Sequence, residues 1–175
     1  MAIKNTQQGF ALLVAIIFMS VMLSFGLALG SLSYKQQVLS SGAIESQYAF
    51  YVADAALECA LYADQQQSIF AYPSSDPSSV PTITCDGSVA ISANKIWSTS
   101  QWIVTNRISL DSGKHCADVT VYKYKYNPPD PNNSAAYDLS YISTYVFSQG
   151  YNASCDTTAN PNGARFVSRA ISTHY

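Results

Sequence analysis

Residue types that carry enzyme chemistry are sparse in this sequence. Asp54 and Glu58 are four residues apart, so their carboxylates share one face of any helix that contains them. Paired carboxylates can do acid and base chemistry or bind a hard cation. They can equally form a solvated helix face or contact a neighbouring subunit, and this second interpretation is the one we favour.

The other reactive groups lack the spacing that catalysis or metal binding requires. Neither His115 nor His174 lies near an obvious nucleophile and acid, and the sequence contains no G-x-S-x-G turn and no phosphate-binding glycine loop. No two cysteines form a CxxC pair, so a zinc site is not expected. The sequence therefore predicts no enzyme, no metal and no cofactor.

All four cysteines follow an apolar N-terminal run, which indicates disulfides formed in an oxidising compartment. Four cysteines allow three pairings. We expect Cys59 to pair with Cys85, because the proline-rich stretch before Cys85 must fold back toward the helix end that carries Cys59. We expect Cys116 to pair with Cys155, because Cys116 opens one predicted strand and Cys155 follows its antiparallel neighbour.

The apolar run itself covers residues 10–34 and contains no Asp, Glu, Lys or Arg. As a helix it would be about 37 Å long, enough to cross a bilayer core of about 30 Å with some tilt. A secretory signal has an apolar stretch of only about 7–15 residues, so that interpretation fits poorly. With Lys4 before it, the run predicts a single-pass membrane anchor whose N-terminus stays in the cytoplasm.

A helical pattern continues beyond Tyr34 and should end before the stretch 71–81, which is rich in proline and serine. Apolar residues at spacings of three or four predict one apolar face of this helix. They are Ile44, Tyr48, Tyr51, Ala55, Cys59 and Tyr62.

The C-terminal half changes to the period of two that is typical of strands. Strands are predicted at 101–110, 115–126, 141–151 and 164–175, while the proline-rich segment 127–138 should be an edge connection. We expect an α+β fold, in which an antiparallel sheet packs on the helix. In 115–126, Val119, Val121, Lys123 and Lys125 should face one way, and Thr120, Tyr122, Tyr124 and Tyr126 the other.

Two surfaces of the predicted sheet could bind a partner. The tyrosines of 115–126 could stack sugars or bases, although such rows more often pack on a helix or form cross-strand pairs. Arg165 and Arg169 share one side of the last strand with Val167 and Ile171, which favours a solvated or subunit-contacting edge. A formal net charge of −2 and a charged content of 11% argue against a nucleic-acid partner.

The stretch "QQGFALLVAIIF" resembles the class III leader of type IV pilins and type II secretion pseudopilins. The resemblance implies that a prepilin peptidase cuts between Gly9 and Phe10 and methylates the new amino terminus. The segment "AFYVADAALECALYAD" at 49–64 is similar to the helix of minor pilins of the PilX type. The family fold is one long N-terminal helix, apolar in its first half, packed on an antiparallel sheet.

The resemblance divides the chain into four parts. They are a leader at 1–9, a transmembrane and filament-core helix at 10–34, an amphipathic continuation at 35–70 and a β-rich extracellular head at 71–175. The chain is therefore expected in the cytoplasmic membrane with its head outside, and then in a cell-surface filament. Its partners would be other pilin-like subunits, the prepilin peptidase and the assembly machinery.

One departure from the family is informative. Most major pilins have Glu at mature position five, where its carboxylate pairs with the amino terminus of a neighbouring subunit; this chain has Val14. The tip-capping pseudopilin also lacks this Glu, so the resemblance implies a minor or initiating subunit. The alternative is an ordinary subunit that tolerates Val14.

The leading functional hypothesis is thus a structural subunit that leaves the membrane and packs helix to helix. Gly26 and Gly30, four residues apart, form a small-xxx-small face that permits close helix packing. The alternative is a signal-anchored extracellular binding or adhesion module that does not polymerise and uses its tyrosine-rich sheet to hold a glycan or a surface partner.

Overall fold

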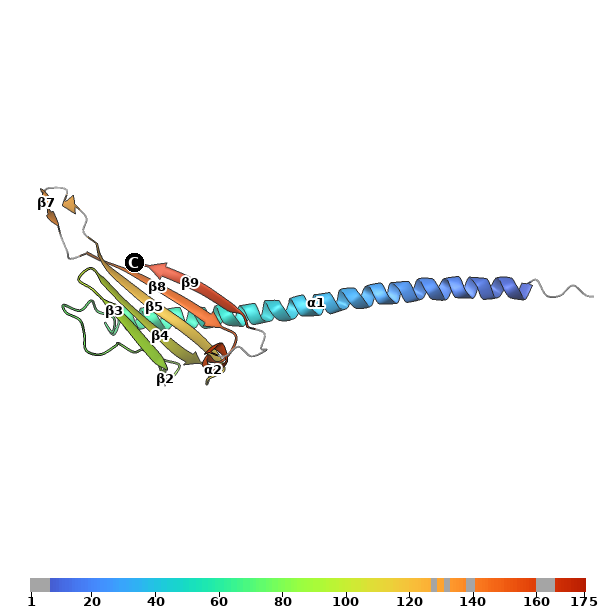
Figure 1. The fold of residues 1–175 in the computed structure, drawn as a ribbon, viewed down its shortest axis with the longest axis horizontal. Helices are drawn as coiled ribbons and strands as arrows, with labels where there is room; N and C mark the ends of the chain where they lie inside the picture. Colours follow the sequence, from blue (N-terminus) through green and yellow to red (C-terminus); the bar gives the residue numbers. More distant parts are fainter. Residues whose placement is uncertain (1–6, 127–128, 131–132, 138–140, 160–165) are drawn as a thin grey trace, which may run out of the picture. The chain divides into compact units, whose positions relative to one another are not determined.

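The computed structural model describes residues 7–126, 129–130, 133–137, 141–159 and 166–175. The chain divides into two compact units, an N-terminal unit that reaches Ala43 and a head that runs from Ile44 to Tyr175 (Figure 1). Helix α1, Gln7–Gln65, belongs to both units, because the division falls within it.

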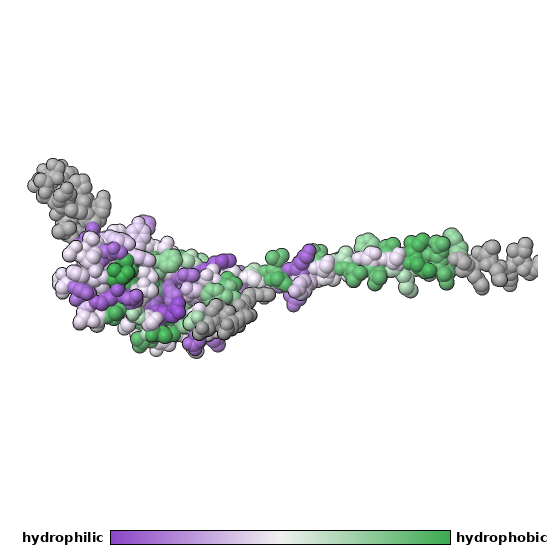
Figure 2. Space-filling view, viewed as in Figure 1, coloured by the Kyte–Doolittle hydropathy of each residue, from purple (hydrophilic) through white to green (hydrophobic). Residues whose placement is uncertain are grey.

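The N-terminal part of α1 is apolar and uncovered. In the described chain, α1 is the one helix long and apolar enough to cross a membrane, and its most apolar stretch is uncovered. Figure 2 shows hydrophobic residues over this part of the helix. The hydroxyls of Ser20, Ser24 and Ser31 donate to main-chain carbonyls three or four residues earlier, at 2.8–2.9 Å, so these polar groups are satisfied within the helix.

Helix α1 ends at Gln65, before the predicted boundary at residue 70. The main-chain N–H of Ile69 donates to the carbonyl of Ala63 at 3.0 Å, and Ser68 between them is left-handed with φ 54°. A left-handed residue closed by such a six-residue hydrogen bond is a common way for a helix to stop. The backbone therefore turns before the proline-rich stretch begins.

Five antiparallel strands form the sheet of the head, in the order β3-β4-β5-β8-β9. Together with α1 they give the expected α+β layout. The three central strands have the predicted bounds, whereas β3 was not predicted and the last strand is shorter than 164–175. The strands are β3 Ser92–Trp97, β4 Gln101–Leu110, β5 His115–Tyr126, β8 Tyr141–Tyr151 and β9 Ser168–His174.

Short hairpins and a short helix lie outside the five-stranded sheet. Strands β1, Thr84–Cys85, and β2, Ser88–Val89, form a hairpin whose turn residues Asp86 and Gly87 both have positive φ. The predicted connection between β5 and β8 contains a second hairpin of β6, Pro129–Asp130, and β7, Asn133–Tyr137. A short helix α2, Cys155–Ala159, follows β8.

The helix face that packs on the sheet consists mostly of alanines, so the predicted apolar face was wrong. In that predicted face Tyr51 is 65% exposed, and Ile44, Tyr48, Ala55 and Tyr62 are also exposed. Small side chains let the helix lie close to the sheet, while tyrosines keep their hydroxyls in water. The buried residues of this half of α1 include Ala49, Val52, Ala53, Ala56, Leu57, Ala60 and Ala63.

The sheet presents its apolar residues to this alanine face in strict alternation. Every second residue of β4 is buried, from Trp102 to Leu110. Val119 and Val121 of β5 and Val146 of β8 join the same core cluster. Buried Asn106 also secures the loop above it, because its amide accepts from the N–H of Ile83 at 3.3 Å and donates to the carbonyl of Pro81 at 3.2 Å.

Candidate functional site

The sequence-predicted reactive residues do not come together into a catalytic centre. Asp54 is half-buried and Glu58 is exposed on α1. The ring of His115 stacks on Tyr48 with ring centroids 5.8 Å apart, and that of His174 stacks on Tyr145. Among the described residues, no group of three or more His, Cys, Asp or Glu side chains could hold a metal ion.

The predicted processing junction lies at the start of α1. The helix begins at Gln7, so Gly9 and Phe10 lie in its first turn, and Phe10 is 72% exposed. Val14 is 47% exposed one turn further on. A Cβ added to Gly26 or Gly30 would meet nothing within 4 Å, so this helix face is open for a neighbour.

Two disulfides fasten the head, and they are the pairs that the sequence predicts. Cys59 of α1 is bonded to Cys85 of β1, and Cys116 at the start of β5 is bonded to Cys155 of α2. Cysteines in disulfides indicate an oxidising, extracellular location for the head. The apolar helix indicates a membrane anchor.

A buried ion pair joins the end of α1 to the centre of the sheet. Lys123 Nζ of β5 lies 2.7 Å from Asp64 Oδ1, and the two side chains are 11% and 3% exposed. The hydroxyl of Tyr175 donates to Asp64 Oδ2 at 2.5 Å, and its main chain bonds twice to Thr144. Burial, followed by the hydrogen bond to Asp64, raises the pKa of Tyr175 above its ordinary value.

The sequence contains a signal for this pair that was missed. Lys123 shares the alternation phase of Val119 and Val121, whose side chains are buried. A lysine in the buried phase of a strand requires a carboxylate partner. The identity of that partner, however, depends on how α1 lies on the sheet.

A second polar network lies on the other face of the sheet. Arg107 of β4 makes a bidentate pair with Asp118 of β5, with N–O distances of 2.7 and 2.8 Å, and Tyr151 of β8 donates to the same carboxylate at 2.9 Å. The hydrogen bond to Asp118 raises the pKa of the Arg107 guanidinium. Burial, with the Asp118 hydrogen bond second, raises the pKa of Tyr151 to about 12.

Tyr122 and Tyr124 of β5 also lie on this outer face, away from α1, because they alternate with the buried residues Val121 and Lys123. Tyr124 is 38% exposed, and β8 adds Tyr145 at 46% and Phe147 at 38%. We call this surface the aromatic face. It comprises Tyr122, Tyr124, Tyr145, Phe147 and His174.

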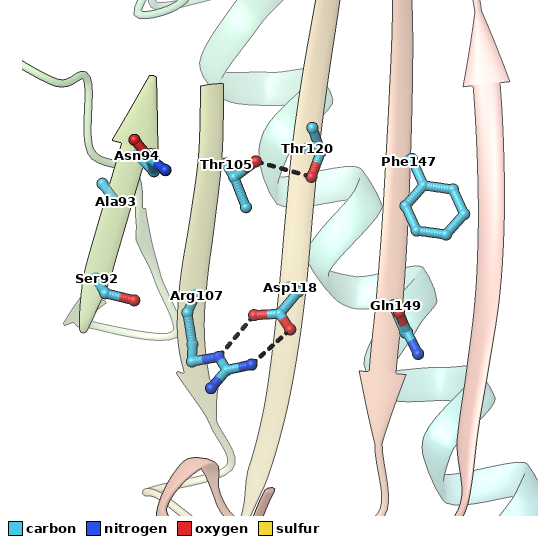
Figure 3. Close-up of a pocket in the computed structure, with 9 residues that line it drawn as sticks. All are labelled: Ser92, Ala93, Asn94, Thr105, Arg107, Asp118, Thr120, Phe147 and Gln149. Atoms are coloured by element: carbon cyan, nitrogen blue, oxygen red, sulfur yellow. Dashed lines mark hydrogen bonds and ion pairs between the residues drawn. The ribbon is translucent and has the colours of Figure 1, made fainter. Parts of the chain in front are cut away.

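Strand register orders the outer face into rows. One row runs Ile96, Ile103, Tyr122, Tyr145 and His174 across all five strands. Polar rows follow beside it, in which the hydroxyls of Thr105 and Thr120 are 3.1 Å apart. Figure 3 shows these polar side chains on the strands, with Phe147 beside them and the helix behind the sheet.

Arg169 lies on edge strand β9, where it is exposed and its Nε donates to the hydroxyl of Ser46 at 2.8 Å. It shares its side of the strand with Ile171, as predicted, whereas Arg165 lies outside the described residues. Arg169 therefore contributes to holding β9 against α1 within the head.

No family model matches this chain, and no curated protein or solved structure is significantly similar to it.

Proposed function

We propose that this chain is a structural subunit of a type IV pilus-like or type II secretion-like filament, in a minor or initiating position. The observation that carries the proposal is the double use of α1. Its uncharged N-terminal part is uncovered, while its alanine-rich part from Ala49 to Ala63 is the core of a disulfide-braced head. A helix of this kind supports both membrane anchoring and later packing against copies of itself.

Assembly by this chain would be physical rather than chemical. The apolar helix moves from lipid into a helical bundle, so its burial is exchanged between two apolar surroundings and van der Waals packing decides the register. The open face at Gly26 and Gly30 supports close approach of a neighbouring helix. Other pilin-like subunits and an assembly machinery are the partners that this mechanism requires.

The leader would keep the chain in the membrane until it is cut. A prepilin peptidase would cut between Gly9 and Phe10 and methylate Phe10, so that the apolar helix starts at the new amino terminus. The absence of Asp, Glu, Lys and Arg from residues 10–34 supports this division. The head would then lie outside the cytoplasmic membrane, where its disulfides are stable.

N-terminal sequencing and intact mass of the protein, taken from membranes and from sheared surface filaments, test the proposal. We expect the filament form to begin at Phe10 with a methylated amine. Gly9→Leu should leave a full-length chain in the membrane, whereas the matched variant Gln8→Ala should still be cut. A native chain that retains Met1, or that starts near Ser31, would contradict the proposal.

A second candidate is the anchored binding module that does not polymerise. The exposed aromatic face favours a binding role, because large aromatic side chains in contact with water are typical of recognition surfaces. An uncut Gly9 together with absence from sheared filaments would favour this second candidate.

A further inference from the structure

The outer face of the sheet is almost free of net charge. Among the described strand residues of this face, Arg107 and Asp118 are the charged pair, and they neutralise each other through their bidentate contact. The lysines of β3 and β5 lie in the other alternation phase, where Lys95 pairs with Asp76 and Lys123 with Asp64. A ligand of this face is therefore not selected by charge.

The aromatic rings of this face stack in two pairs. Tyr122 and Tyr124 stack with centroids 6.4 Å apart and an interplanar angle of 11°, and Tyr145 and His174 stack at 5.3 Å and 20°. Rings that are already ordered lose little rotamer freedom when a ligand binds. The face is therefore pre-organised for flat, partly apolar groups.

The aromatic face and the polar rows beside it contain two adjoining depressions. The first has a volume of about 470 Å³ and lies among Tyr122, Tyr124, Tyr145 and Phe147. The second has a volume of about 410 Å³ and lies between Phe147 and the Arg107–Asp118 pair. Phe147 borders both, so an aromatic area and a hydrogen-bonding area are continuous.

The second depression offers both donors and acceptors. Figure 3 shows the amide groups of Asn94 and Gln149 at its border, with the Arg107–Asp118 pair and the Thr105–Thr120 pair beside them. Planar amides and hydroxyls can each bond to a ligand hydroxyl in either sense. Such groups suit an uncharged ligand rich in hydroxyls.

We propose that the aromatic face binds a neutral polysaccharide. The C–H face of each pyranose ring packs on an aromatic ring, and its hydroxyls bond to the amides and hydroxyls of the second depression. Nucleic acids and anionic glycans are disfavoured, because the described residues of this face include no unpaired lysine or arginine to attract them. Binding of the polysaccharide does not depend on whether the chain polymerises.

Calorimetric titration of the full-length chain in detergent micelles tests this, with cellohexaose, maltohexaose and chitohexaose as probes. We expect at least one of these neutral oligosaccharides to bind. Tyr145→Ala and Phe147→Ala should each weaken that binding about tenfold, since each removes an aromatic stacking surface. The matched control Tyr62→Ala removes a 59% exposed tyrosine from α1 and should leave the affinity unchanged.

Circular dichroism and intact disulfides establish that each variant is folded. Gln149→Ala provides a separate test in the second depression, where we expect a several-fold loss. The proposal is overturned if none of the three probes binds at millimolar concentration, if Tyr62→Ala weakens binding as much as Tyr145→Ala, or if heparin binds in preference to the neutral probes. Self-association of the chain that Tyr145→Ala abolishes, without sugar binding, also overturns it. Cleavage at Gly9 is measured independently, so failure of this inference leaves the filament proposal intact.

Discussion

Ser148 of β8 donates a hydrogen bond from its Oγ to the main-chain carbonyl of Ala53, 2.7 Å away, so the sheet is bonded directly to the backbone of α1. Two residues further along the strand, Gly150 lies against the main chain of Ala49 and Ala53. At Gly150 the helix and the sheet therefore meet through backbone on both sides.

Gly150→Ala should destabilise the head by about 1–3 kcal/mol or more, because the added methyl group would meet helix backbone that no rotamer change can move. Thermal unfolding of the full-length chain, followed by circular dichroism, measures the loss. Gly42→Ala is the matched control, since its added Cβ meets nothing within 4 Å. Equal stability of the two variants would show that helix and sheet are further apart.

Lys123→Met should cost about 3–5 kcal/mol, because it leaves the Asp64 carboxylate buried without its cation. Tyr175→Phe removes one hydrogen bond to the same charged carboxylate and should cost about 1.5–3 kcal/mol. Denaturant unfolding gives both values. Lys114→Met, at a side chain that is 71% exposed, should change stability by no more than about 0.5 kcal/mol. If Lys123→Met lowered the free energy of unfolding by no more than about 0.5 kcal/mol, the buried ion pair would be ruled out.

Stability should fall at alkaline pH because of Tyr151. Its pKa is raised from 10.0 to about 12, so between these values the folded state retains a proton that the unfolded state has lost. The unfolding free energy therefore decreases as pH rises through this window and is unaffected below it. Tyr151→Phe should make the decrease shallower, while the raised pKa of Tyr175 keeps part of it, and urea unfolding across the window measures the slope. An unchanged slope in the variant would contradict the assignment.

Removing either disulfide should cost about 3–4 kcal/mol in the chain-entropy model, because the bridges span sequence separations of 26 and 39 residues. Double Cys→Ser variants of each pair measure this by thermal unfolding. A non-reduced peptide map checks the pairing. A peptide that joins Cys59 to Cys116 or to Cys155, or two free thiols in secreted protein, would disprove it.

In the proposed filament, Val14 should keep this chain a minor component, because it offers no carboxylate to the amino terminus of a neighbouring subunit. Subunit stoichiometry of purified filaments, by quantitative mass spectrometry, measures the share of this chain. Val14→Glu should raise that share, whereas Val14→Ile should not. A native chain that forms the dominant band would defeat the minor-subunit hypothesis.

The parts of the fold that depend on local pattern were predictable. Strands β4, β5 and β8 carry clear alternation between turn signals, and the bounds of each match the prediction. Their neighbouring order placed Cys116 near Cys155, because Cys116 lies opposite Tyr151 in the register. Strand β3 was missed, since Ser92–Trp97 has little intrinsic strand character and forms by pairing with β4.

The parts that depend on tertiary packing were not predictable in the same way. Tyrosines and alanines recur on α1 with the same helical period, so the period alone does not tell which set faces the sheet. Gly150 decides it, because a strand without a side chain at that point accepts an alanine-lined helix. The rows of side chains on the outer face could not be predicted without the strand register. Tyr122 and Tyr145 become neighbours only when β5 pairs with β8.

The Cys59–Cys85 bridge also has a mechanical consequence. It joins the last turns of α1 to β1, so the C-terminal part of the helix is covalently linked to the head by the bridge as well as by the chain itself. Tension applied along α1 loads the contacts from Ala49 to Leu57 first and then the covalent bridge at Cys59, which protects the contacts that follow at Ala60 and Ala63. The head would therefore resist being peeled from its helix under load, and reduction of that one bridge would lower the force at which the two separate.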